Sequence, residues 1–462
     1  MDTTLRVWSV LLLLIVSGRS FSDDVKRLSS KLENPDEVRK YYDIDSDLLD
    51  KADASGVKVA VLSKGFRGAE DQDAKVEDFF RKRYLPQSMK LFSEYDVASF
   101  GLEGRNEIGR RVAQTIWSLS GLADDGPEFH LYNANGLVAF REAANALVEW
   151  GADVVVCTEN FSAFGNFDGT GIVNRLVDLA AIGEMIWIQS AGEFATKVIN
   201  LPIKVKERKL DQPDPQVKVF ADDTEATLTL SWNAYSPGFR RFYGTDKDLD
   251  MILYDNKGTE VASSRTRQVE GDAGDGESNF AVEQMTAKLF KDRSPYYIRI
   301  RIENGDFDPR SDELRLTVDT DRRPFFDGQK EQSAIELVDG NREKSIPVPA
   351  DNKWATTVGS THPFSSEGPT ADGRKKPDLV LDGAESRYTD KVAISGPNIA
   401  AAQLGALAVL YKANFPRFNR KHWLLALQRS SLTPKGELKP DRKKSAYFGA
   451  RSRDEIHDLM EE

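Results

Sequence analysis

Side chains able to carry acid–base or nucleophilic chemistry are scarce in this sequence. Its 462 residues include four histidines, at positions 130, 362, 422 and 457, and one cysteine, Cys157. A single cysteine excludes an intrachain disulfide and a zinc site built from several thiolates. Because general-base catalysis at neutral pH most often uses histidine, the positions of these four rings decide which hydrolytic mechanisms are open to the chain.

The one pattern typical of metal binding is acidic. Asp246, Asp248 and Asp250 alternate at the start of a predicted strand, and Asp255 and the loop 271–278 add further carboxylates. Oxygen-rich groups of this kind can hold calcium. The spacing matches no EF-hand loop, and acidic turns between strands are commonly only solvated. Calcium binding and a solvated acidic surface therefore both stay open.

A group of aromatic side chains lies in the same region of the sequence. It consists of Trp232, Tyr235, Phe239, Phe242 and Tyr243. Large aromatic rings serve either as core or as recognition surfaces. We expect mainly core, with recognition by an exposed loop as the alternative.

Alternating strands and helices indicate the architecture of the first part of the chain. The run GVKVAVLSKGF (56–66) is rich in β-branched residues, which is typical of a strand buried on both faces. Further strands are predicted at 152–157 and 185–189, and helices at 69–84, 106–119, 137–150 and 172–182. This alternation predicts an α/β fold in which helices cover both faces of a parallel sheet.

The pattern changes near Asp211. Four segments then alternate with period two and have no helix between them, namely 224–232, 249–255, 296–303 and 313–319. Such spacing is typical of an antiparallel sandwich. A buried strand within 353–360 and an apolar helix at 398–413 resume the α/β pattern. We therefore predict an α/β domain of residues 23–211 and 323–462, interrupted by an all-β insert of residues 212–322.

Four segments, in this order, resemble the signature blocks of subtilisin-like serine proteases. VAVLSKGF (59–66) is similar to VAVIDTGF, IGRRVA (108–113) to HGTxVA, and the strand ending in SAGE (190–193) to one ending in SAGN. FSSEGPTADGRKKPDLV (364–380), followed by SGPNIAAAQLGALAVLY (395–411), resembles FSSxGPTxDGRxKPD followed by GTSMAAPHVAGAAALL. The resemblance implies a subtilisin-like fold, and some bacterial members of the family carry a β-rich insert at this place.

Each functional residue of that family is replaced at the matching position. Ser63 stands at the catalytic aspartate, Ile108 at the histidine, Asn398 at the nucleophilic serine, and Glu193 at the asparagine of the oxyanion hole. Isoleucine cannot act as a base, an amide is a poor nucleophile, and a carboxylate repels a developing oxyanion. No histidine lies within 106–115 or near Asn398, so a small shift of register restores nothing. The resemblance thus implies a degenerate peptidase without catalytic residues or cofactor.

Three functions remain compatible with such a chain. The first is binding or a structural role in an extracytoplasmic assembly, through stable contacts with another exported protein made by the insert 212–322, by its aromatic segment 232–243, or by both. The second is residual hydrolysis by a relocated nucleophile, and the third is regulation by competition with active proteases. Asn160 replaces a glycine that receives substrate backbone in the family, so we expect a crowded groove. A balance of 63 basic against 74 acidic residues argues against a nucleic-acid partner.

The N-terminal residues have the layout of a secretory signal. Arg6 precedes an apolar run at 7–16, and Ser20 and Ser22 frame a cleavage site before Asp23. The run is too short to span a bilayer, and no later stretch is long and apolar enough to do so. The sequence therefore predicts export to the periplasm or the cell exterior, with residues 1–22 removed.

We predict that the mature N-terminus is Asp23 or lies within a few residues of it, because signal cleavage follows small side chains. Mass spectrometry of the protein purified from its own cells measures this directly. Recovery of a mature chain that still carries residues 1–21 would contradict the prediction.

Overall fold

The computed structural model describes most of the predicted α/β domain and insert. The described residues are 39, 46–50, 52–66, 90–92, 108–120, 126–203, 216–235, 244–308, 310–320, 335–338, 340, 342–381, 383 and 395–430. The predicted signal segment, the predicted helix at 69–84, Phe239, Phe242, Tyr243 and His457 lie outside them.

A seven-stranded sheet forms the centre of the α/β body, in the order β18-β17-β5-β4-β1-β3-β2. All its pairings are parallel. The strands are β1 (Lys58–Ser63), β2 (Lys90–Phe92), β3 (Glu128–Asn133), β4 (Val154–Cys157), β5 (Ile186–Ser190), β17 (Thr356–Ser360) and β18 (Leu379–Leu381). The predicted strands at 56–66, 152–157, 185–189 and 353–360 are thus confirmed, whereas β2, β3 and β18 were not predicted.

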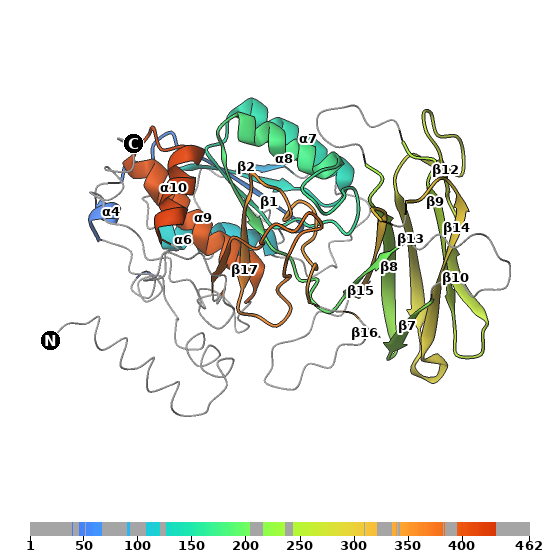
Figure 1. Cartoon of the computed structure of the whole chain (residues 1–462). Helices are drawn as coiled ribbons and strands as arrows, with labels where there is room; N and C mark the ends of the chain where they lie inside the picture. The colour runs from blue at the N-terminus through green and yellow to red at the C-terminus, as the bar shows by residue number, and fades with distance from the viewer. Residues whose placement is uncertain are drawn as a thin grey trace, which may run out of the picture.

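Helices cover both faces of this sheet (Figure 1). One hydrophobic cluster joins Val59 and Val61 of β1 to α6 (Ile108–Ser120) and α9 (Pro397–Asn414), with α4 (Ser46–Asp50) and α10 (Arg420–Ser430) beside them. A second cluster joins Ala60 and Leu62, which point the other way, to α7 (Leu137–Trp150) and α8 (Ile172–Ile182). Because side chains alternate along a strand, apolar residues at successive positions are what allow a helix layer on each face.

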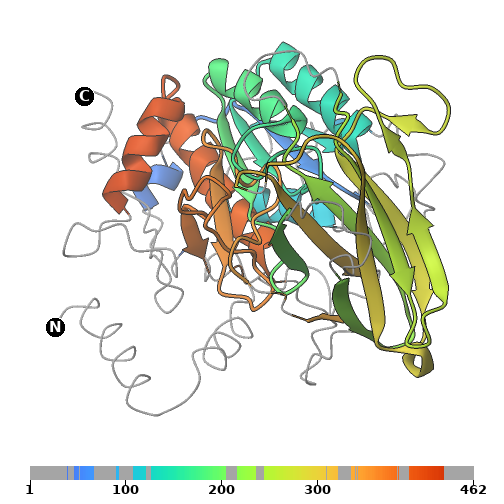
Figure 2. The ribbon, with the colours of Figure 1, turned by 45° about the vertical axis from the view of Figure 1, so that its right-hand side comes forward.

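Two antiparallel sheets form the sandwich, which lies at the opposite end of the molecule from α10 (Figures 1 and 2). Their strand orders are β10-β9-β14-β7-β16 and β13-β8-β15-β6. The strands are β6 (Val198–Pro202), β7 (Gln216–Ala221), β8 (Thr224–Trp232), β9 (Asp248–Tyr254), β10 (Glu260–Ser264), β13 (Val282–Leu289), β14 (Tyr296–Asn304), β15 (Glu313–Thr320) and β16 (Ile335–Leu337). A short parallel pair, β11 (Arg267–Gln268) and β12 (Glu277–Ser278), adjoins them, so the predicted loop 271–278 ends in a strand.

The antiparallel sheets extend beyond the predicted insert of residues 212–322. β6 precedes that range and pairs with β15, from Leu314 opposite Leu201 to Thr317 opposite Val198. β16 follows the range and pairs with β7. The sandwich therefore takes its strands from residues 198 to 337, and a cut at 212 and 322 would remove the partners of both outer strands.

Side chains from both parts fix the sandwich against the α/β body. Phe164, in the loop before α8, packs edge-on against Phe280 with ring centres 5.5 Å apart. The Asn166 amide bonds to the backbone of Tyr235 in both directions, because its Oδ1 accepts from the amide N at 3.0 Å and its Nδ2 donates to the carbonyl O at 2.8 Å. Ile172, at the start of α8, packs against the sandwich core.

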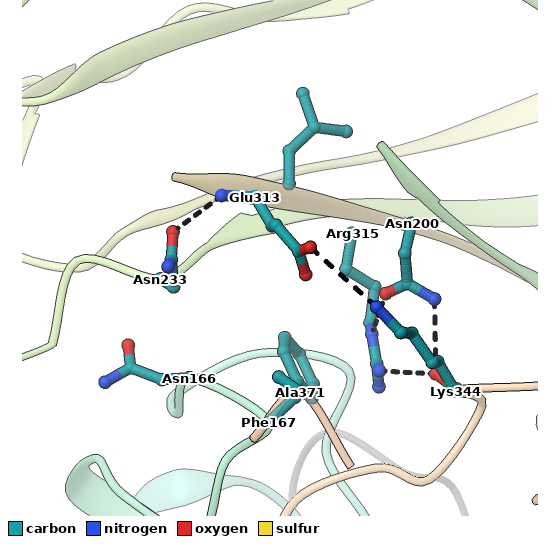
Figure 3. A pocket seen from close by; sticks show the side chains of 9 residues that line it. Asn166, Phe167, Asn200, Asn233, Glu313, Arg315, Lys344 and Ala371 are labelled. Carbon is teal, nitrogen blue, oxygen red and sulfur yellow. Dashed lines mark hydrogen bonds and ion pairs between the residues drawn. The ribbon is translucent and has the colours of Figure 1, made fainter. Parts of the chain in front are cut away.

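Arg315 of β15 makes the most extensive of these contacts (Figure 3). Its buried guanidinium donates to Asn200 Oδ1 at 2.9 Å, to the Ile346 carbonyl at 2.7 Å and to the Lys344 carbonyl at 2.6 Å. It also lies 3.6 Å over the ring of Phe167 in the α/β body. Burial lowers the pKa of Arg315 to about 9, so this cation is held by neutral acceptors at a considerable desolvation cost.

We predict that Arg315→Met lowers the free energy of unfolding by about 2–4 kcal/mol. The buried acceptors would lose their donor, and relief of the arginine desolvation offsets this only in part. Urea unfolding measures the loss, with Arg310→Met as the matched control, because Arg310 is an exposed arginine of the same region. Equal stabilities of the two variants would show that Arg315 does not hold the junction.

Candidate functional site

The positions that match the protease blocks lie at one edge of the parallel sheet. Ser63 ends β1, and Glu193 follows the end of β5 by three residues. The carboxyl ends of parallel strands share an edge, which is where α/β proteins place their sites. α6 starts at Ile108 beside this edge, because the Gly109 amide N donates to the Gly65 carbonyl at 2.9 Å. Glu193 in turn contacts the start of α9, two residues before Asn398.

The Ser63 side chain is fully buried, and its hydroxyl pairs with the hydroxyl of Thr158. Thr158 Oγ1, just after β4, donates to Ser63 Oγ at 2.7 Å, and the Thr158 amide N bonds to the Leu62 carbonyl at 2.9 Å. This pair occupies the place that a carboxylate takes in the resembling family. Neither hydroxyl carries the negative charge that would stabilise an imidazolium.

Ile108 belongs to the hydrophobic core rather than to an open cleft. Its side chain is 4% exposed and lies in the cluster that contains Phe66 and Val112. The adjacent Gly109 must be glycine, because a Cβ there would lie 2.5 Å from the Phe66 ring. Position 108 therefore has no titratable group and no path to solvent.

Glu193 lies beside the N-terminus of α9. Its Oε1 is 3.2 Å from the place that a Cβ on Gly396 would take, and Gly396 has a φ of 131° that favours glycine. No side chain caps this helix by a hydrogen bond. A carboxylate beside a helix N-terminus is favoured by the macrodipole. Asn398 Oδ1 is buried nearby without a hydrogen-bond partner. By the sequence resemblance, position 193 matches the oxyanion asparagine, and the structure has an acceptor there in place of a donor.

Asn160 fills space between the segments that follow β4 and β5. Its Nδ2 donates to the Thr158 carbonyl at 3.2 Å, and its Oδ1 accepts from Gln189 Nε2 at 3.4 Å. A Cβ on Gly192 would lie 3.3 Å from Asn160 Cγ. These contacts place the Asn160 side chain in space that a glycine at this position would leave free, and the crowded groove stays a prediction.

The three described histidines bond elsewhere. His130, on β3, stacks on Trp150 with ring centres 3.5 Å apart and bonds to Glu128 Oε1 at 3.0 Å. Burial lowers the pKa of His130. His362 Nδ1 accepts from the Phe364 amide N, and His422 Nδ1 accepts from the Asn419 amide N. These contacts give each ring a local structural role.

The predicted calcium ligands lie along β9 and in the residues on either side of it. Asp246 lies before β9, Asp248 and Asp250 lie on it, and Asp255 pairs with Arg293 at 2.6 Å. Burial, then the neighbouring carboxylates, raise the pKa of Asp250 to about 6. Within the described residues no three His, Cys, Asp or Glu side chains form a group suited to a metal ion. The structure therefore offers the calcium interpretation no support at these positions.

The described part of the aromatic group is core. Trp232 is 1% exposed and Tyr235 is 3% exposed, and both lie in the sandwich cluster. The core interpretation is confirmed for these two rings.

A small pocket lies at the junction of the sandwich and the body (Figure 3). It lies above Phe167 and Arg315. An ion pair between Glu313 and Lys344, 3.8 Å long and half exposed, lies at its edge. The amides of Asn200 and Asn233 that face it bond to protein partners already. The pocket is thus a feature of the junction, with its polar groups paired internally.

Asp351 is a buried carboxyl close to the same junction. It accepts from the Gly169 amide N at 2.8 Å and from Asn174 Nδ2 at 3.0 Å. Burial, with a smaller contribution from Asp168, raises the pKa of Asp351 from 3.8 to about 6. Between these pH values the folded state binds more protons than the unfolded state, so this group makes the protein less stable as the pH rises.

We predict that Asp351→Asn reduces this pH dependence. Between pH 4.5 and pH 7, the free energy of unfolding should fall by about 2 kcal/mol less in the variant than in the wild type. Urea unfolding at the two pH values measures the difference, and Asp275→Asn, in an exposed loop, is the control. A pH dependence equal to the wild type would refute the assignment.

Comparison with known proteins bears on the fold. No protein-family model and no curated protein matches the chain. Among solved structures, the CspB protease of Clostridium perfringens is similar over 94% of this chain and 99% of its own, at 12% identity and a TM-score of 0.52. MycP1 from Mycobacterium smegmatis is similar at a lower level, with 11% identity and a TM-score of 0.36 over 91% of this chain and 82% of its own. Pseudomonas sedolisin, a serine-carboxyl proteinase, has 13% identity and a TM-score of 0.38 over 87% of each chain.

These identities show the fold alone. The similarity to the CspB protease covers nearly the whole of both chains. It confirms the predicted fold class, a subtilisin-like parallel α/β sheet combined with antiparallel sheets.

Proposed function

We propose that the protein is a catalytically inactive relative of subtilisin-like proteases that acts by binding another exported protein, as a component of an extracytoplasmic assembly. The burial of Ser63 and Ile108 is the observation that carries the proposal, since Ser63 is 0% and Ile108 is 4% exposed. A hydrolase of this type needs a base that reaches both its nucleophile and solvent. At this edge of the sheet the corresponding positions hold a hydroxyl pair and an aliphatic side chain.

The charge at the helix end supports the same conclusion. A tetrahedral intermediate needs donors at the oxyanion, whereas Glu193 brings a carboxylate to that place. In subtilisin-type sites, loss of one triad member costs about 10⁴- to 10⁶-fold in turnover. Replacement of the triad and of the oxyanion donor together leaves no term that would accelerate hydrolysis.

What the chain keeps is a large folded body with extensive surfaces. The sandwich and the α/β part are joined by buried polar and aromatic contacts, which hold the surfaces in fixed relative positions. Such a body suits stable protein contacts rather than turnover. In the described part of the chain no helix has the length and apolar character to cross a bilayer.

The two alternative functions have less support. Competition for peptides needs an open groove, and Asn160 fills the space beside Gly192. Hydrolysis by a relocated serine needs a base, and the described histidines bond to Glu128 and to backbone amides.

We predict that the purified protein hydrolyses neither casein nor generic peptide and ester substrates, and that a fluorophosphonate probe labels no serine. Asn398→Ser should stay unlabelled too, because Ile108 leaves the new hydroxyl unactivated. An active subtilisin-type protease treated in parallel is the positive control. Labelling that disappears when the protein is heat-denatured, or when one particular serine is replaced, would overturn the proposal.

A further inference from the structure

Three large apolar side chains are exposed close to the end of α8. Leu179 is 41% exposed and Ile182 is 69% exposed, and Trp354, in the loop before β17, is 38% exposed. Single exposed apolar residues are common, but a group that includes tryptophan marks an interaction site more often than chance.

Two hydrogen bonds hold the loop of Trp354 and the start of α10 beside the end of α8. Asn352 Nδ2 donates to Asp178 Oδ1 at 3.0 Å, which holds the loop of Trp354 against the last turn of α8. The Arg420 amide N donates to the Glu184 carbonyl at 3.3 Å, which holds the start of α10 just beyond that turn. We call the surface formed by Leu179, Ile182, Lys353, Trp354 and Arg420 the α8–α10 patch.

Cations flank the tryptophan. The Arg420 guanidinium lies 4.6 Å from the centre of the Trp354 ring, and Lys353 Nζ lies 5.0 Å from it. Arg420 Nε and Nη1 are buried and have no hydrogen-bond partner. Because these two atoms are buried, a ligand meets the partly exposed remainder of the Arg420 side chain and the exposed Lys353, and a carboxylate is the group that pairs best with such cations. The net charge of the chain, −11, opposes an acidic ligand in general, so it is these local cations beside Trp354 that favour one here.

The patch lies far from both parts of the molecule considered so far. α8 starts at Ile172, which packs on the sandwich, and ends at Ile182 on the side of α10 (Figures 1 and 2). β5 starts at Ile186, so the end of α8 lies at the amino edge of the sheet, opposite the edge of Ser63 and Glu193. A ligand bound here leaves the protease-like edge untouched.

We infer that the α8–α10 patch docks an acidic and apolar segment of another protein. An apolar side chain of the segment packs on Trp354 and Ile182, and a neighbouring carboxylate accepts from Arg420. Apolar contact supplies most of the affinity, while the charge fixes which segment binds. The inference names a surface for the proposed binding role, but it does not depend on the loss of catalysis.

Photocrosslinking in the native cells tests the site. A photoreactive amino acid replaces Ile182 in one variant and Val138 in a control variant. Val138 is 57% exposed at the other end of the adjacent helix α7. We expect one protein crosslinked at position 182 and not at 138, through a segment that contains Asp or Glu beside an apolar residue. No crosslink, equal crosslinks at both positions, a lipid adduct or a second copy of this chain would overturn the inference.

A synthetic peptide of the crosslinked segment then tests the chemistry. Its affinity for the purified full-length protein should fall about 10- to 100-fold with Arg420→Gln and with Trp354→Ala. The affinity should change less than about twofold with Val138→Asp. A second peptide, in which Asn and Gln replace Asp and Glu, should bind the wild type as weakly as the acidic peptide binds Arg420→Gln. Unchanged affinity in Arg420→Gln, with its unfolding midpoint preserved, would refute the role of the charge. Fluorophosphonate labelling tests catalysis separately, so the two proposals fail independently.

Discussion

The structure depends on one buried cation, Arg315. It reaches from β15 to Asn200 on β6, to the Lys344 and Ile346 carbonyls, and to the ring of Phe167. Burying a guanidinium is costly, so it persists only where several acceptors surround it at once. Those acceptors come from segments on both sides of the inserted sheets. The bond from Arg315 to Asn200 links β15 to β6 within the sandwich, and the other contacts of Arg315 reach the segment after β16 and the α/β body. The sandwich and the body are therefore joined by one side chain and form one unit.

Sequence patterns predicted the elements whose side chains follow one period. The bounds of α7, α8 and β8 agree with those predicted, because a helical or alternating period runs through each whole segment. β3 lacks a continuous apolar run, since Glu128, His130 and Asn133 are polar, although His130 is buried in the structure. β6 and β16 are short, and only their pairing with β15 and β7 makes them strands. Tertiary partners decided these elements, and local sequence does not contain that information.

The positions that match the protease blocks could be located in the sequence, but their contacts in the structure could not. The bond between Thr158 and Ser63 joins residues on β1 and after β4, and Glu193 meets α9 across about 200 residues of chain. Arg315 had no sequence signal, because an arginine in an alternating strand normally points to solvent. Only the packing of the sandwich against the body turns that face inward. For the same reason Trp354 and Arg420, far apart in the chain, could not be recognised as one surface.

The two edges of the parallel sheet differ in how completely their side chains are satisfied. At the carboxyl edge, the positions that match the protease blocks make internal contacts, through the Ser63–Thr158 pair and the approach of Glu193 to α9. At the amino edge, Trp354 and Arg420 leave apolar area and unpaired donors that cost stability. A chain selected for stability alone would gain by replacing them with small polar residues. Their presence follows if a bound partner covers them, because the rigid sheet that carries these segments holds a docking surface in a fixed arrangement.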